Sequence, residues 1–73
     1  MNKSPLVLVD PQILGGTPVF VGTRVPPQAL FGYLELGHSL DEFLADFPSV
    51  PRELAVAVLE EAHDALIHRA RSA

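Results

Sequence analysis

Cysteine is absent from this 73-residue sequence, and histidine occurs only three times, as His38, His63 and His68. Without cysteine the chain has no disulfide bonds and no thiolate ligands, an absence that fits a reducing compartment. No two histidines are three or four residues apart, the spacing that directs two imidazoles to one ion on a helix. The sequence therefore predicts no metal site and no cofactor.

Basic residues are also scarce: five Lys or Arg stand against nine Asp or Glu, which gives a net charge of −4. Such a chain repels nucleic acid at long range and favours a basic protein partner. A long apolar segment near the N-terminus is missing too, because the run at residues 6–9 is far too short for a signal peptide or a membrane span. We expect a soluble, cytoplasmic protein that does not associate with membranes.

Apolar residues, in contrast, make up 48% of the sequence. A domain of this size buries only about 60% of the surface that its unfolded chain exposes, so its own core is marginal. Small domains without disulfides or metals usually gain stability from a partner chain. Part of the apolar surface should therefore be an interface, and we expect a homodimer formed through the strands and the apolar helix faces.

A chain of this length makes one domain, which we place over residues 1–73. Its amino-acid composition changes along the chain, since residues 1–25 hold most of the glycine and β-branched residues. This first part predicts an arm of strands and turns. Residues 26–62 predict a three-helix core, and residues 63–73 a C-terminal helical extension.

Two short apolar runs in the arm, residues 6–9 and 18–21, are bounded by proline and glycine and have the pattern of strands. The first run is apolar throughout, which predicts a strand covered on both faces. Gly22 is expected to take a positive φ in a tight turn or bulge, after which Arg24 and Val25 would continue the ladder. Two strands this short are not stable alone, so they must pair with another chain or lie on the helices.

The glycine-rich stretches in this arm, Gly15-Gly16 and Gly22-Thr23-Arg24, have two interpretations. Glycine backbones beside an arginine can cradle a phosphate. Neither stretch, however, has the glycine spacing of a phosphate-binding loop, and neither directly opens a helix. We therefore interpret Gly15, Gly16, Gly22 and Thr23 as structural turn residues.

The guanidinium of Arg24 suits a carboxylate, a row of carbonyls or a phosphate equally well. Because Arg24 is nearly the only charge in its part of the chain, we expect it to clamp the hairpin to a helix end or to an acidic side chain. The alternative is a contact with nucleic acid, in which case Lys3, Arg24 and Arg52 would be the DNA-binding residues.

Helical periodicity follows the arm. Pro27 suits the first position of a helix and Gly37 suits its left-handed C-terminal cap, which predicts a first helix over residues 27–36. Ser39 and Glu42 then match a capping box, in which side chain and backbone exchange hydrogen bonds at the start of a second helix. The inward side chains of the second helix should be Leu40, Phe43, Leu44 and Phe47.

A third, longer helix is predicted to begin at Pro51 and to run into the sixties. Its first half, residues 54–59, is apolar all round, which predicts that this half is buried all round. Three helices, the last two joined by a tight turn, have the pattern of a helix-turn-helix or homeodomain-like unit. We therefore predict a mainly α fold, a three-helix bundle preceded by a short β-hairpin or strand pair.

The third helix can be assessed as a DNA-reading helix. Such a helix presents Arg, Lys, Asn or Gln from its first turns. This one offers Arg52, and its next charges are Glu53, Glu60 and Glu61. DNA binding is therefore expected to be weak, or to need a dimer that combines the basic residues of two copies.

No group of residues predicts catalysis. The carboxylates are explained as caps in the first turns of helices and as solvated helix faces. None of the histidines has an evident nucleophile or paired acid in the sequence around it. We expect a non-enzymatic protein without catalytic residues.

The segment from Asp10 to Pro26 reads DP-x-I-L-GG-x-P-V-x-VGTRVP. It resembles the opening signature of the bacterial domain-of-unknown-function-433 family. That family continues with a helix, a Gly followed by a Ser-x-x-Glu cap, an aromatic-Pro turn and a final helix rich in Ala and Leu. The resemblance therefore spans roughly Leu6 to Ala62, and its two glycine-containing elements together are specific.

The resemblance implies a homeodomain-like fold and, for many members, a VapB-type antitoxin that blocks a PIN-like ribonuclease toxin, often with repression of its own operon. Three positions depart from the family pattern: Thr17 replaces a common Lys, Pro51 replaces a capping Thr, and Glu61 lies near a frequent aromatic. The loss of a basic side chain and the gain of an acidic one weaken the implied DNA binding. A stand-alone DNA-binding regulator and an adaptor without a toxin remain as alternatives.

The C-terminal segment is the expected toxin-binding surface. Leu66, Ile67 and Ala70 would form an apolar ridge of the kind that enters a partner's groove. Arg69 and Arg71 could place a guanidinium among the carboxylates that hold metal in a PIN-like active site. The alternative is that these arginines only complement the dipole of their helix.

Overall fold

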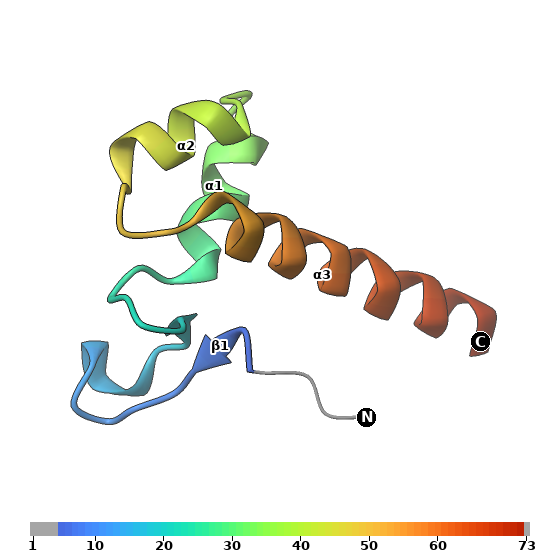
Figure 1. The fold of residues 1–73 in the computed structure, drawn as a ribbon. Coiled ribbons are helices and arrows are strands. Elements are labelled where there is room, and N and C mark those ends of the chain that lie inside the picture. The colour runs from blue at the N-terminus through green and yellow to red at the C-terminus, as the bar shows by residue number, and fades with distance from the viewer. Residues whose placement is uncertain (1–4, 73) are drawn as a thin grey trace.

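The computed structural model describes residues 5–72 of the chain (Figure 1). Two short strands and one turn of 3₁₀ helix come first, and three α-helices follow, which confirms the predicted fold class. The elements are β1 (Val7–Leu8), the 3₁₀ turn (Leu14–Gly16), β2 (Val19–Phe20), α1 (Pro27–Glu35), α2 (Leu40–Asp46) and α3 (Arg52–Ser72). Lys3, one of the predicted DNA contacts, lies outside the described residues.

The helices are arranged around α1, which contacts both α2 and α3. Figure 1 shows β1 on one side of α1, α2 on the other, and α3 running away from all of them toward the C-terminus. Within residues 5–72 there is no helical segment with the length and apolarity that a bilayer span requires.

The strands pair antiparallel, with Val7 opposite Phe20 and Leu8 opposite Val19. Both side chains of β2 are fully buried, whereas those of β1 are 37% and 40% exposed. The prediction that the first strand is covered on both faces is therefore wrong. The reason is that Phe20 of β2 packs into the helical core, while β1 forms an edge of a two-stranded sheet and stays partly exposed within residues 5–72.

The turn after β2 is built from Gly22 and Thr23. Gly22 has the expected positive φ, 77°, which glycine adopts without a steric penalty. The Thr23 hydroxyl donates to the Phe20 carbonyl at 2.9 Å and accepts from the Val25 amide at 3.0 Å. The Phe20 amide donates to the Val25 carbonyl at 2.8 Å, so the chain turns back on β2 and adds no further strand there.

Both ends of the α1–α2 connection are capped as the sequence predicts. Gly37 has φ of 89°, and the His38 amide donates to the Tyr33 carbonyl at 2.9 Å, the long bond of a Schellman motif. At the start of α2 the Glu42 amide donates to the Ser39 hydroxyl at 3.0 Å. The Ser39 amide donates to the Glu42 carboxylate at 2.7 Å, which completes the capping box.

The core is a cluster of side chains from β2 and all three helices. Phe43 is buried at its centre, with ring centroids 6.2 Å from Phe20, 5.4 Å from Tyr33 and 4.8 Å from Phe47. The predicted inward face of α2 is confirmed, since its other members are half-buried against this cluster. The buried members of the cluster are Phe20, Leu30, Phe43, Val50, Ala55 and Val58.

The first half of α3 has one buried face. Ala55 and Val58 are buried, but the other residues of the range 54–59 are only half-buried. The prediction that this half is buried all round is wrong, because two short helices and a two-stranded sheet are too small to surround a central helix.

Candidate protein-interaction surface

The second half of α3 extends beyond the core. Every residue from 60 to 71 is exposed, and Figure 1 shows this part of the helix running free of the other elements. We call residues 60–71 the distal segment. Leu66 is 62% exposed and Ile67 is 38% exposed, and large apolar side chains that stand together on a surface mark interaction sites. The distal segment carries every residue predicted to bind a toxin: Leu66, Ile67, Arg69, Ala70 and Arg71.

Apolar side chains of the distal segment continue the core-facing side of α3. Ala55 is buried and Leu59 is half-buried, and Ala62, Leu66 and Ala70 follow them at spacings of three and four residues. This spacing places all five on one side of the helix. The side that α3 packs against the domain therefore continues, uncovered, along the distal segment.

Charges in the distal segment are ordered along the helix. Glu60, Glu61 and Asp64 come first, and Arg69 and Arg71 lie in the last turn. The arginines are placed where the negative end of the helix dipole favours a cation. The distal segment is thus acidic where it leaves the domain and basic at its tip.

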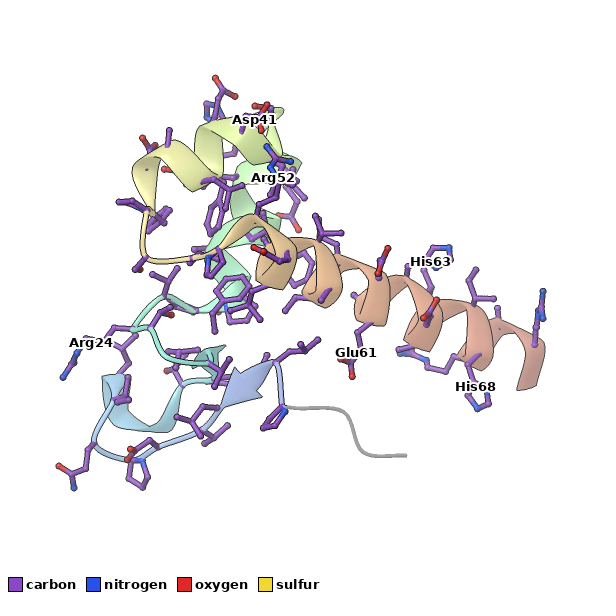
Figure 2. The ribbon with its side chains drawn as sticks, viewed as in Figure 1. Arg24, Asp41, Arg52, Glu61, His63 and His68 are labelled. Atoms are coloured by element: carbon purple, nitrogen blue, oxygen red, sulfur yellow. The ribbon has the colours of Figure 1, made fainter. Side chains whose placement is uncertain are left out.

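A groove of about 680 Å³ lies beside the start of the distal segment, between α3, α1 and the N-terminal arm. Its lining includes Leu6 from the arm, Phe31 from α1, and Ala62 and Ala65 from α3. Glu61 adds a carboxylate to this apolar lining, and Figure 2 shows its side chain directed from α3 to the side on which β1 lies. The groove can therefore accept an apolar side chain together with a cation.

The two described residues of the predicted DNA-binding set do not form a common surface. Arg52, at the start of α3, pairs with Asp41 of α2, whereas Arg24 lies on the turn after β2 (Figure 2). Within residues 5–72 no hydrogen bond or ion pair involves Arg24, whose side chain is exposed. The predicted clamp by Arg24 is therefore not seen among residues 5–72, where the hydroxyl of Thr23 closes the turn after β2.

Two polar pairs lie where α1 meets α2. The Tyr33 hydroxyl donates to the Asp46 carboxylate at 2.6 Å, and this hydrogen bond raises the pKa of Tyr33 above its ordinary value of 10.0. Glu42 accepts from the Ser39 amide, and its carboxylate lies 3.4 Å from Nδ1 of His38. The hydrogen bond from Ser39 and the nearby imidazole lower the pKa of Glu42. Among residues 5–72 we find no cluster of three metal-ligating side chains.

Sequence reasoning missed the groove and the pair between Arg52 and Asp41. The groove is lined by segments that are far apart in the chain. Hydrophobic periodicity shows which face of each segment is apolar, but it does not show which segments lie next to each other. A signal for the ion pair was present, since Asp41 lies in the first turn of one helix and Arg52 in the first turn of the next. What the sequence lacks is the distance between these two turns.

Residues 7–62 match the family described as "Protein of unknown function (DUF433)", which covers most of the chain. The chain belongs to the DUF433 family. The DUF433 match includes the strands, α1, α2 and the groove-lining Ala62, and it ends there. Leu66, Arg69 and Arg71 therefore lie beyond the part of the chain that the DUF433 match covers.

The DUF433 chain is also similar to "Uncharacterized protein y4eO" of Sinorhizobium fredii (strain NBRC 101917 / NGR234), with 44% identity over 48 residues. The aligned part covers 66% of this chain and 22% of that protein, so the chain corresponds to a minor part of its relative's length. No solved structure matches this DUF433 chain.

Proposed function

We propose that this DUF433 chain is the antitoxin of a bacterial type II toxin–antitoxin pair, a non-enzymatic cytoplasmic protein that binds and neutralises a PIN-like ribonuclease. The observation that carries the proposal is the exposed distal segment of α3. Leu66 and Ile67 offer apolar contact there, and Arg69 and Arg71 offer positive charge. An amphipathic helix of this kind suits a hydrophobic groove on a partner protein.

Charge supports this class of partner. A nuclease that works with bound metal gathers carboxylates in its active site and needs a basic surface to hold RNA. The guanidinium of Arg69 or Arg71 would take the place of the metal cation among those carboxylates. The net charge of −4 would complement the basic surface around the active site and speed the encounter of the two proteins.

A second role, repression of its own operon, is favoured by one observation. Arg24 is exposed, and Figure 2 shows its side chain pointing away from the rest of the chain, where it could reach a phosphate. Arg52 is less available because it pairs with Asp41. A single available arginine on an acidic chain supports a stand-alone DNA-binding regulator less well than an antitoxin.

The test uses the ribonuclease encoded by the neighbouring reading frame, recognised by the spaced acidic residues of a PIN-type metal site. Deletion of residues 66–73 should abolish inhibition of RNA cleavage, because it removes the proposed contact surface. Circular dichroism should show that the fold survives, since the buried core ends at Val58.

Point variants refine this test. Ile67→Asp and Arg71→Glu should each weaken inhibition, whereas Glu60→Gln, a change at another exposed position of the distal segment, should not. Undiminished inhibition by the deletion variant would move the interface to the strand pair or the first two helices. A neighbouring nuclease that the full chain does not inhibit would leave an adaptor without a toxin as the better explanation.

A further inference from the structure

The first turns of the distal segment form one wall of the groove. Ala62 and Ala65 line the groove, and Leu66 and Arg69 follow them by one helical turn, on the same side of the helix. One side of α3 thus presents an apolar recess and, next to it, an exposed apolar side chain of the size that such a recess accepts. Nothing among residues 5–72 fills this groove.

Glu61 and Arg69 give this side of α3 a particular charge pattern. They are eight residues apart, or roughly 12 Å along the helix axis, so they cannot pair within one chain. Both are exposed, and Ala65 lies midway between them. A second helix laid antiparallel, with its own Ala65 opposite, would bring its Arg69 to Glu61 and its Glu61 to Arg69.

We infer that the distal segment of α3 pairs antiparallel with the same segment of a second copy of this chain, about a two-fold axis near Ala65. Leu66 of each chain then enters the groove of the other chain, against Ala62 and Phe31. Each Glu61 meets the second copy's Arg69. The contact uses one patch twice, as a two-fold interface requires.

The charge pattern favours a second copy of the chain as the partner, and it favours the antiparallel arrangement of the two helices. A parallel arrangement would place Glu61 beside Glu61 and Arg69 beside Arg69, which is unfavourable, whereas the antiparallel arrangement forms two opposite-charge pairs. Antiparallel helices also place the positive end of one dipole beside the negative end of the other. A second copy therefore complements the groove in shape, in apolarity and in charge.

The pairing of two copies does not depend on the proposed antitoxin function, but it limits when a toxin can bind. Leu66 and Arg69 belong to both proposed contacts, so pairing with a second copy and binding of a toxin should exclude each other. Ile67 lies about half a turn away from the side that lines the groove, by the 100° rotation per residue of a helix. Ile67→Asp should therefore spare pairing of two copies, and its effect on toxin inhibition can be measured separately.

Sedimentation equilibrium of the full chain tests the inference. The wild-type chain should dimerise with a dissociation constant between roughly 1 and 100 µM. Glu61→Arg and Arg69→Glu should each weaken dimerisation roughly tenfold or more, because each replaces both opposite-charge pairs by repulsion. The decisive sample is an equimolar mixture of these two variants. One chain then carries two arginines at these positions and the other two glutamates, so the mixture should associate as a heterodimer.

Matched controls exclude a general effect of charge. Glu60→Arg and Arg71→Glu reverse neighbouring exposed charges that do not line the groove, and they should leave dimerisation within about twofold of the wild type. Leu66→Asp should abolish it while circular dichroism remains that of a folded chain. A wild-type chain that stays monomeric at roughly 100 µM would overturn the inference. So would two charge variants that fail to associate when mixed, or that dimerise as well as the controls.

Discussion

Thr23 closes the turn after β2. Its hydroxyl donates to the Phe20 carbonyl and accepts from the Val25 amide, so it holds together the two sides of the turn after β2. These bonds are part-buried, which makes their loss more costly than the loss of a solvated contact. Gly22 supplies the positive φ that lets the turn close.

The first prediction concerns this hydroxyl. Thr23→Val keeps the shape of the side chain but leaves the Val25 amide without its acceptor. The Phe20 carbonyl loses one of its two donors and keeps the Thr23 amide. The variant should therefore lower the free energy of unfolding by about 1–2 kcal/mol. Arg24→Ala should change it by less than about 0.5 kcal/mol, because Arg24 is exposed. Urea unfolding followed by circular dichroism measures both. A larger loss for Arg24→Ala than for Thr23→Val would restore the clamp.

The second prediction concerns pH and Glu42. The Ser39 amide, and then His38, lower the pKa of the folded-state carboxyl below its ordinary value of 4.5. A lowered folded-state pKa contributes stability above the ordinary pKa, and this stability is lost as pH falls through the lowered value. The urea midpoint of the wild type should therefore fall more steeply below pH 4.5 than that of Glu42→Gln.

Ser39→Ala is the matched control for this pH dependence. It removes the capping hydroxyl and should cost about 1 kcal/mol at neutral pH. It keeps the backbone amide that donates to the Glu42 carboxylate, so most of the pH dependence should remain. A Glu42→Gln variant with the same acid sensitivity as the wild type would show that other carboxylates control it.

At the scale of elements, α3 is one helix whose two halves differ in what surrounds them. Residues up to Leu59 pack on the domain, whereas the distal segment makes its backbone hydrogen bonds without tertiary support. Isolated helices shorter than about 12–15 residues are marginal in water. The core can therefore be stable while the tip of the same helix opens frequently.

Hydrogen exchange provides the third prediction. In dilute solution the amides near Val58 and Leu59 should be protected, and protection should fall along the distal segment toward Arg71, because its opening does not require unfolding of the core. Raising the protein concentration should increase protection between Glu61 and Arg69 if two copies pair there. Uniform protection along all of α3 at every concentration would contradict both statements.

The sequence predicted caps and turns better than burial. Gly37, Ser39 and Glu42 were placed correctly because their hydrogen bonds span only a few residues, so local spacing determines them. The prediction that residues 54–59 are buried on all sides is wrong because the sequence shows how apolar a helix is and not what surrounds it. Only the assembled fold shows that the other elements cover one side of α3.

The candidate surface was predicted only in part. The sequence located its side chains, since an apolar ridge with two arginines near a helix end can be read from helical spacing. It did not locate the groove, because Leu6, Phe31 and Ala62 come together only through the packing of the arm and two helices. The partner of Arg52 was missed for the same reason.

At the scale of the whole molecule, negative charge is the dominant long-range property. Nine acidic residues against five basic ones create a field that opposes approach to DNA. Among residues 5–72 the exposed arginines are spread over separate parts of the molecule, since Arg24 lies on the turn after β2 and the distal arginines lie at the tip of α3.

The fourth prediction follows from this distribution. The isolated chain should bind duplex DNA of arbitrary sequence feebly, with a dissociation constant above about 10 µM at physiological salt. Fluorescence anisotropy with a labelled duplex measures it, and Arg24→Glu should weaken whatever binding remains. Submicromolar binding to unrelated sequences would mean that the basic residues of two or more chains meet on one surface.

Tyr33 determines what optical measurements on this chain can report. It is the single tyrosine, and the sequence has no tryptophan, so nearly all intrinsic fluorescence comes from this side chain. Its ring contacts those of His38, Phe43 and Phe47, and its hydroxyl donates to Asp46, all at the junction of α1 and α2. Its emission will therefore follow unfolding of the domain closely. Binding events along the distal segment will leave it nearly unchanged, and a fluorophore placed on that segment is needed to detect them.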